Sequence, residues 1–526
     1  MHQKHLRFAM AAVVIAMGLY ACNTVVDPEG SAPGGDIEAG VLEASAPSAP
    51  TDDGTPDSPT SDAGTPGSDA STASDASTPP VASDASLDGA PAILEPVTPC
   101  RKIYGGRANE YSSHVAIDRV GNVAILFDSE GINAGGHPLP TVSEVIDLGG
   151  GVLANGPLVS FDSSCEVRWS RPLPLPYVAP RAISYAPSGH LWVLQTSNNT
   201  HQLTEIDTGG NDVRVIQLPA SASKMVVDGG GNILLQGGFT GTVDLGGGPA
   251  TIGPSGGFFV MKLDPNGAYA WSTVVPWGTA NSPVSVGIQA APNGDVIIGG
   301  RHRGVFDLGG GGIPLPAPPS GQTNAYLLRF DAATGAIAWA QPWMTPGAGF
   351  DSFAVDGIGE IYVAGSALPN INAMRPFVAK RSGAGTLVWT STTNAIEIDV
   401  GPIVGRAAGA YLTLVKKELW YKPQYAKVVP IDPAGVPPSA FSPAVLSVGY
   451  SRDASLSDTS KPSLLLRALA TAADDRLVAA GSFQGRLSVG IGTSTLPGAT
   501  SKLSLPDLHT PSHQFQGSDG FMVMRP

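Results

Sequence analysis

The sequence is poor in cysteine, in charge and in long apolar runs, and these scarcities exclude several classes of protein. Only three cysteines occur, and no His or Cys stands at ligand spacing around Cys100 or Cys165, so no metal site is expected. Lysine and arginine number 30 against 44 acids, with no basic stripe for nucleic acid. Phosphate-binding loops and dinucleotide fingerprints are also missing, and we expect no cofactor.

The one long apolar run lies at the N-terminus, where residues 1–21 are typical of a lipoprotein signal peptide. A short basic segment precedes the apolar run 8–20, which is too short for a spanning helix of roughly 20 residues. The run ends in Leu19-Tyr20-Ala21-Cys22, which resembles a lipobox, although Tyr20 is bulkier than that motif usually takes. We expect Cys22 to carry a lipid that anchors the chain to a membrane. The alternative is an ordinary cleaved signal peptide with an incidental cysteine.

Asn23, which follows the lipidated cysteine, bears on the choice of membrane. An aspartate at this position resembles an inner-membrane retention signal, and it is missing here. The sequence therefore favours the outer membrane of a cell with two membranes.

Residues 22–99 are rich in Ser, Pro, Asp and Ala and predict a disordered linker, because they offer too little apolar surface to offset chain entropy. The linker holds fourteen acids and neither Lys nor Arg. It therefore accounts for the net charge of −14, and with +2 in the signal segment residues 100–526 are near −2. The acidity describes the linker and says nothing about the partners of the body.

Cys100 and Cys165 remain as an even pair once Cys22 is assigned to the lipid. In an oxidising compartment such a pair favours a disulfide, with two free thiols as the alternative.

The body, residues 100–526, is built from internal repeats. One unit contains the runs 224–239, 243–248 and 257–267 and ends in Ala270-Trp271-Ser272. Each unit holds four short β-rich runs separated by Gly, Asn, Asp and Pro turns, which is typical of a propeller blade. The first hairpin of each unit is expected near Gly121, Gly189, Gly231, Gly294, Gly359, Gly409 and Asp475.

These repeats predict an all-β fold, a seven-bladed β-propeller behind the disordered N-terminal linker. Six or eight blades remain possible, because the unit near 411–429 is the least regular. The last unit, ending at 520–526, lacks a fourth strand, and the run 101–105 is one strand left over at the other end. We expect this run to complete the last blade and close the ring, which removes exposed strand edges.

The Val-Asp-x-x-Gly-Asn turn, the Asp-Leu-Gly-Gly-Gly insert and the Trp-bearing fourth strand resemble the β-propeller repeats of the SBBP and delta-60 kind in myxobacterial secreted proteins and lipoproteins. The resemblance covers about 110–526; it implies the architecture and is nearly silent on activity. The stretch from Asp331 to Trp339 also looks like the repeat of quinoprotein-type propellers, which include scaffold lipoproteins of outer-membrane assembly.

Most residues with conspicuous chemistry have a structural interpretation. Asp118, Asp228 and Asp356 precede tight turns and are expected to accept hydrogen bonds from them. Four tryptophans at equivalent places in the repeats are expected to pack between blades, with an aromatic ligand cage as the alternative: Trp169, Trp271, Trp339 and Trp389.

Two groups of exposed-looking residues are the candidates for ligand binding. Arg301, His302 and Arg303 lie in the fourth unit. Trp420, Tyr421 and Tyr425 lie in the sixth. The alternative is that both groups are ordinary outer-strand side chains.

No catalytic constellation is recognisable, and we do not expect an enzyme. The sequence predicts an exported lipoprotein at the cell envelope whose propeller is a non-enzymatic binding scaffold, with a protein or glycan partner at its loop face. One alternative is an envelope-assembly scaffold similar to the quinoprotein-like lipoproteins, which rests on fold analogy. Another is a carbohydrate-active propeller enzyme with acids gathered at the central channel.

Overall fold

The computed structural model describes much of the repeat region and none of the residues before it. All described residues belong to one compact unit, Ala90–Pro526. The predicted signal peptide, the lipidated Cys22 and the linker up to residue 99 lie outside the described residues. Those described are 100–104, 110–129, 158–173, 180–196, 200–277, 284–306, 308, 315–318, 323–342, 349–367, 375–392, 398–416, 425–433, 446–451, 464–472, 474–483, 486–491, 503–504 and 519–525.

The described residues form seven antiparallel sheets, each a blade of at least four strands. Blade 1 comprises β2 (Glu110–Ile117), β3 (Val123–Ser129), β4 (Leu158–Phe161) and β5 (Val167–Arg171). Blade 2 comprises β6 (Pro180–Tyr185), β7 (Leu191–Thr196), β8 (His201–Ile206) and β9 (Asp212–Gln217). Blade 3 comprises β10 (Ala222–Val227), β11 (Ile233–Asp244), β12 (Pro249–Leu263) and β13 (Tyr269–Pro276).

The remaining blades follow in chain order, and only the last two depart from four consecutive strands. Blade 4 comprises β14 (Val284–Ala290), β15 (Val296–His302), β16 (Asn324–Phe330) and β17 (Ile337–Pro342). Blade 5 comprises β18 (Gly349–Val355), β19 (Ile361–Ala367), β20 (Arg375–Arg381) and β21 (Leu387–Thr392). Blade 6 comprises β22 (Ile398–Gly405), β23 (Ala410–Lys416), β24 (Tyr425–Ile431), β25 (Leu446–Ser451), β28 (Arg486–Ile491) and β29 (Leu503–Ser504). Blade 7 comprises β26 (Leu464–Thr471), β27 (Leu477–Phe483), β30 (Asp519–Arg525) and β1 (Cys100–Tyr104).

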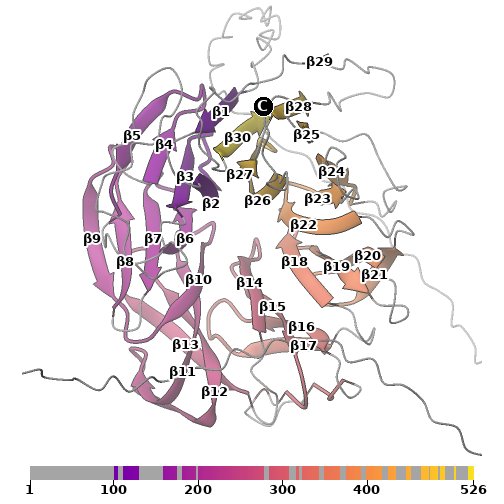
Figure 1. Ribbon diagram of the computed structural model, residues 1–526. Coiled ribbons are helices and arrows are strands. Elements are labelled where there is room, and N and C mark those ends of the chain that lie inside the picture. The colour runs from indigo at the N-terminus through magenta and orange to yellow at the C-terminus, as the bar shows by residue number, and fades with distance from the viewer. Residues whose placement is uncertain are drawn as a thin grey trace, which may run out of the picture. The chain divides into compact units, whose positions relative to one another are not determined.

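The blades stand around a ring with their first strands innermost (Figure 1). Each first strand contacts the first strand of the next blade, from β2 through β6, β10, β14, β18 and β22 to β26, which contacts β2 again. The circuit is closed, and the fold is the predicted seven-bladed β-propeller. In the part of the chain described here, no helix is long and apolar enough to span a membrane.

The blade turns lie where the repeats predicted them. The turn between the first and second strands of each blade contains a residue with positive φ: Gly121, Gly189, Gly231, Gly294, Gly359, Gly409 and Asp475. At Gly121 φ is +90°, in the left-handed region that favours glycine, and the Arg476 guanidinium of blade 7 packs against it.

The two ends of the domain meet in blade 7, as predicted. β1 pairs antiparallel with β30, so that Cys100 lies opposite Met524 and Tyr104 opposite Gly520. The first strand of the body thereby supplies the outer strand that the last unit lacks. Blade 6 departs from the repeat, because β28, from the chain between β27 and β30, pairs with β25 at its outer edge.

The hydrophobic core is divided into clusters between neighbouring blades. Leu234 and Phe258 of blade 3 pack with Ile298 and Leu328 of blade 4, for example. The paired second and third strands are buried on both faces, which explains their nearly continuous apolar sequences, such as Val296–Ile298. Each blade therefore buries both faces only when its neighbours are present.

Candidate functional site at the centre of the ring

Cations on the third strands link blades 3, 4 and 5 to the blade that follows each of them. Lys262, Arg329 and Lys380 occupy equivalent places one residue before the last buried position of β12, β16 and β20. Lys262 Nζ donates to the Ala332 carbonyl at 3.0 Å, and Lys380 Nζ donates to the Pro433 carbonyl at 2.7 Å. Arg329 donates to the Gly383 carbonyl in the same way.

Each of these cations also pairs with an acid of its own blade. Arg329 lies 2.7 Å from Asp295, and Lys380 lies 3.2 Å from Glu360. Lys262 lies 3.9 Å from Asp228. We call these three acid–cation–carbonyl contacts the blade latches. The repeated Lys or Arg in Met-Lys-Leu-Asp and Leu-Arg-Phe-Asp was the sequence signal for them, and residue-by-residue inspection missed it.

The tryptophans of the fourth strands pack between blades, which confirms their structural interpretation. The indole N–H of Trp271 donates to the Ala332 carbonyl at 3.0 Å, and that of Trp169 donates to the Thr208 carbonyl at 3.2 Å. Trp339 donates to the Gly383 carbonyl at 3.3 Å. Trp389 packs against the cluster between blades 5 and 6. The repeated tryptophans thus serve the contact between neighbouring blades.

The turn aspartates are also structural, as predicted. Asp118 Oδ1 accepts the backbone N–H groups of Val120 and Asn122 at 3.0 and 2.8 Å. Asp228 and Asp356 accept equivalent pairs of N–H groups in blades 3 and 5. Their carboxylates are buried, and these hydrogen bonds satisfy them within the turn.

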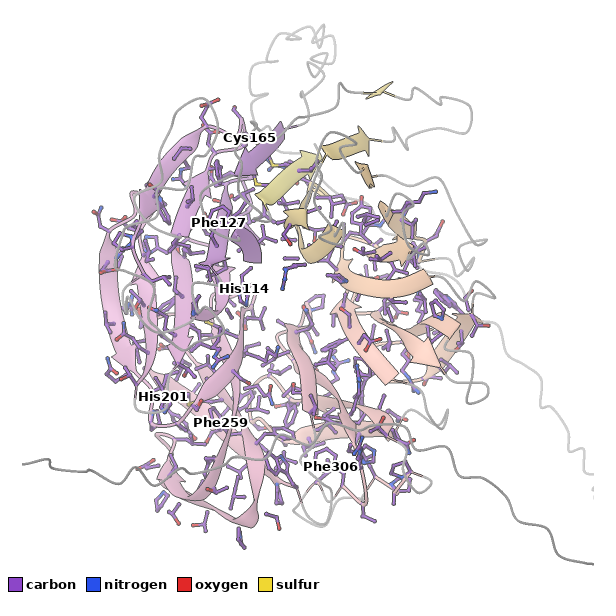
Figure 2. The ribbon with its side chains drawn as sticks, viewed as in Figure 1. His114, Phe127, Cys165, His201, Phe259 and Phe306 are labelled. Carbon is purple, nitrogen blue, oxygen red and sulfur yellow. The ribbon has the colours of Figure 1, made fainter. Side chains whose placement is uncertain are left out.

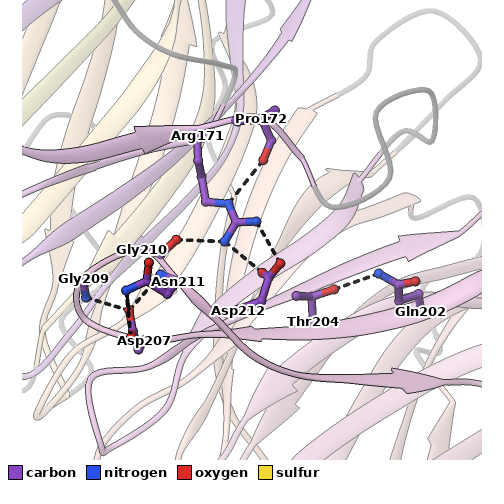
Figure 3. A network of polar contacts seen from close by, with 9 residues as sticks. All are labelled: Arg171, Pro172, Gln202, Thr204, Asp207, Gly209, Gly210, Asn211 and Asp212. Carbon is purple, nitrogen blue, oxygen red and sulfur yellow. Dashed lines mark hydrogen bonds and ion pairs between the residues drawn. The ribbon is translucent and has the colours of Figure 1, made fainter.

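On the outer side of blades 1 and 2 lies a more exposed polar network (Figure 3). Arg171 at the end of β5 pairs with Asp212 at 2.8 Å and donates to the Gly210 carbonyl at 2.8 Å. Beside it Asp207 accepts N–H groups of Gly209 and Asn211, both at 2.8 Å. These bonds join two outer strands and shape one turn.

The predicted group Arg301–His302–Arg303 is divided by the structure. Arg301 donates to the Phe350 carbonyl at 2.8 Å and forms an ion pair with Asp351, both in blade 5. Arg303 is exposed. His302 is only 1% exposed, so the expectation of an exposed side chain was wrong for it. Successive residues of a strand face opposite sides, and His302 therefore turns into the core between Arg301 and Arg303.

His302 lies in a buried polar cluster within the core between blades 3 and 4. Its ring is tilted against those of Phe306 and Tyr326, with ring centroids 5.8 and 6.1 Å away. Its Nδ1 donates to the Gly304 carbonyl at 3.1 Å, and burial lowers its pKa. Among the described residues, His302 Nε2, the Tyr326 hydroxyl and Asn324 Oδ1 are buried without a hydrogen-bond partner.

The other predicted site residues fall largely outside what the structure describes. Trp420, Tyr421 and Cys22 are among the residues not described, and of Tyr425 and Cys100 only the backbone is placed, in β24 and β1. Cys165 is 4% exposed and packs against Met522 and Met524 of β30. Because Met524 is the register partner of Cys100, the backbone of Cys100 and the side chain of Cys165 adjoin the same strand.

The inner strands share an irregularity that re-aims their side chains. In all seven blades the register between the first and second strands shifts near the beginning of the first strand, as a β-bulge does. In blade 2 the shift falls between Pro180 and Ala182, which leaves Arg181 as the extra residue. In blades 1 and 3 the shift is followed directly by His114 and Lys224.

His114, Arg181 and Lys224 form a cluster of basic residues on three neighbouring inner strands, which we call the central basic cluster. Figure 2 shows His114 at the inner side of the ring, by β2. Its ring donates to the backbone carbonyl of Arg181 on β6. Burial and the charges of Lys224 and Arg181 together lower the pKa of His114 to about 4. Burial, followed by the charge of Arg181, also lowers the pKa of Lys224.

Neither Arg181 nor Lys224 forms an ion pair within the described part of the chain. This is unusual, because close cations in a partly buried place normally gather acids. Sequence inspection overlooked these residues, since they stand alone in their strands. Their only sequence signal is their place, four or five residues before the first turn of a blade.

A small cavity of about 160 Å³ lies at the turns of blades 1, 2 and 3. Asp118, Arg119, Tyr185 and Asp228 are among its lining residues. Arg119 donates across it to the Gly229 carbonyl at 3.1 Å, and burial raises the pKa of Tyr185 to about 12. The carboxylates of Asp118 and Asp228 accept hydrogen bonds from their own turns. This cavity therefore has fewer unpartnered charged groups for a ligand than the central basic cluster.

Comparison with known proteins gives no family. No family model matches the chain, and no curated protein matches it. A streptogramin B lyase is similar in structure at 9% identity, with 81% of this chain and 98% of that chain covered and a TM-score of 0.38. Virginiamycin B lyase from Staphylococcus aureus is 13% identical over 60% of this chain and 96% of that one, with a TM-score of 0.32.

A neuraminidase-like protein from a little yellow-shouldered bat isolate is 11% identical over 68% of this chain and 97% of that one, with a TM-score of 0.35. At such identities the likeness concerns the fold alone. The resemblance to SBBP and delta-60 repeats stays a prediction.

Proposed function

We propose that this protein is an exported, lipid-anchored lipoprotein whose β-propeller is a non-enzymatic binding scaffold with its binding site at the centre of the ring. One observation carries the proposal. The cations between the blades have acid partners and serve the fold, whereas Arg181 and Lys224 on the inner strands have no ion-pair partner in the described part of the chain. Residues with perturbed pKa values cluster at functional sites, and the pKa of Lys224 is lowered by burial and by Arg181.

The chemistry of the central basic cluster favours binding. Arg181 is a fixed cation with a planar fork of donors, and Lys224 is a compact cation. His114 is neutral at physiological pH because its pKa is lowered to about 4. A general base in such a place works best with a pKa near the operating pH, and a histidine with so low a pKa is a poor one.

The anchor is proposed from the sequence, in which the apolar run 8–20 precedes Ala21-Cys22. Metabolic labelling with a fatty acid tests it, and we expect label and membrane association in the natural chain and neither in the Cys22→Ala variant. Label retained by that variant would overturn the lipid anchor.

The outer membrane and the cell surface are proposed as the site of action, with a protein or glycan partner. Protease treatment of intact cells, followed by detection of the body, tests the orientation. Loss of the body would place it outside the cell and contradict an envelope-assembly role in the periplasm. Survival of the body during the treatment would contradict the surface-binding role.

We also propose a disulfide between Cys100 and Cys165, which would hold β1 in blade 7. Support comes from the packing of Cys165 against Met524, the register partner of Cys100. Peptide mapping of the exported protein without reduction should yield one linked peptide with both cysteines. Recovery of two alkylated cysteines would contradict the pairing.

A further inference from the structure

The central basic cluster also specifies the chemistry of its ligand. Arg181, Lys224 and His114 lie on β6, β10 and β2, which contact one another in turn around the ring. The positive charges of Arg181 and Lys224 each act on His114, and Arg181 acts on Lys224. The three side chains therefore lie within electrostatic reach of one another on neighbouring strands.

Among the side chains that the structure describes, no acid forms an ion pair with the cluster. No acid appears among the groups that act on His114 or Lys224. On the other side of β2 lies β26, and its inner-strand residue Arg467 is a further cation with contacts of its own. Asp351, the acid of an inner strand in blade 5, is paired with Arg301. The described side chains of the cluster thus bring positive charges together, and an anion would relieve their repulsion.

We propose that His114, Arg181 and Lys224 form a binding site for an oxyanion, a carboxylate, sulfate or phosphate group carried by the ligand of this propeller. The inference rests on the proposed binding function and names the chemistry of its ligand. Arg181 presents a fork that fits two oxygens of such a group, and Lys224 adds a point charge. The bulge at Arg181 holds that residue out of the regular strand pairing, and the His114 hydrogen bond to the Arg181 carbonyl fixes it there.

Binding of the anion should be coupled to uptake of a proton by His114. The bound anion favours the charged forms of Lys224 and His114, and it raises the pKa of both. Since the anion prefers protonated His114, its affinity should rise as the pH falls toward the pKa of that ring. Arg181 on β6 and Lys224 on β10 are the charged groups that act on His114, and neither changes charge as the pH falls through this range.

The full chain, titrated calorimetrically at low ionic strength, tests the site with four probes: inorganic phosphate, sulfate, glucuronate and neutral glucose. We expect the anions to bind and glucose not to bind. The Arg181→Met and Lys224→Met variants should each weaken anion binding at least tenfold. The matched control is Arg171→Met, which removes a cation from the outer side of blade 1 and should leave anion binding within twofold of the natural chain.

Equal losses in the control variant and the two site variants would overturn the proposal, because the binding would then be general attraction to positive charge. Absence of anion binding by the natural chain would overturn it as well. If glucose or another neutral glycan binds, and binding survives both site variants, the anion site fails while the proposed binding function stands. The three anions distinguish a carboxylate ligand from a sulfate or phosphate ligand.

A second measurement does not depend on the variants of Arg181 and Lys224 folding. In the natural chain labelled with ¹³C-histidine, the His114 resonance, assigned by its loss in His114→Gln, should titrate at a higher pH when anion is present. An unmoved His114 titration at saturating anion would place the anion elsewhere.

Discussion

Cations occupy two settings in this propeller, and the difference between them separates fold from function. In the blade latches, Arg329 lies 2.7 Å from Asp295 and donates to the next blade, with both side chains more than four-fifths buried. In the central basic cluster, Lys224 is partly buried beside another cation and no acid. A buried charge costs free energy unless it is paired, and the partly buried Lys224 bears part of that cost without an acid beside it.

The largest effect is expected from breaking a latch. Arg329→Met keeps the apolar stem and removes the guanidinium, which leaves Asp295 buried without its ion pair. Removing one partner of a buried pair costs about 3 kcal/mol or more. We expect the free energy of unfolding to fall by about that amount, measured by urea denaturation of the full chain. A loss below about 1 kcal/mol would show that the latch contributes no more than a surface pair does.

The next effect concerns pH at the centre of the ring. The pKa of His114 is about 4 in the folded chain, against an ordinary histidine value of 6.5, so the unfolded chain binds more protons between these values. The stability is therefore fully present above pH 6.5 and is lost as the pH falls from 6.5 to 4. The loss amounts to about 2 to 3 kcal/mol, given 1.36 kcal/mol per pKa unit and some exposure of the ring.

The His114→Gln variant isolates this contribution, because glutamine cannot titrate and can still donate a hydrogen bond. We expect the difference in unfolding free energy between the natural chain and the variant to change with pH only in this window. A pH-independent difference would mean that the ring titrates normally and is not held neutral by burial and by Arg181 and Lys224.

How far the sequence foretold this structure depends on whether a feature repeats. The turns at Gly121 and at Asp475 were predicted because one recurs in each blade, and the closing role of β1 followed from a strand missing at the other end. The irregular strand pairing of blade 6 was missed. The pairing of β25 with β28 in blade 6 joins segments that no period relates.

In the candidate site, the placement of single side chains was also not predicted from the sequence. Arg301, His302 and Arg303 were taken as one exposed group, yet strand alternation sends His302 into the core and Arg301 toward blade 5. Arg181 escaped notice because its place depends on a register shift, and a bulge has no local sequence signature here. The register between paired strands decides where such side chains point, and this register cannot be derived from the order of the residues alone.

A smaller effect with the opposite sign is expected at Lys224. Lys224→Met removes a cation whose pKa is lowered by burial and by Arg181, and it leaves no acid unpaired. We expect the unfolding free energy to stay the same or to rise by up to about 1 kcal/mol. Denaturation of this variant beside Arg329→Met gives the direct contrast. A loss as large as that of the latch variant would show that Lys224 serves the fold, and it would remove the basis for a ligand there.

The smallest effect is expected at Arg171, although it makes more polar contacts than most residues of the latches. It reaches the Gly210 carbonyl and Asp212, both across the boundary between blades 1 and 2 (Figure 3). Its acid is 46% exposed, against 12% for the acid that pairs with Arg329. Water solvates an exposed carboxylate when its partner is removed, and such pairs contribute about 0 to 1 kcal/mol. Arg171→Met should therefore lower the unfolding free energy by no more than about 1 kcal/mol, measured by urea denaturation. A loss equal to that of Arg329→Met would contradict this. It would mean that the number of contacts, and not burial of the acid, sets the strength of a contact between blades.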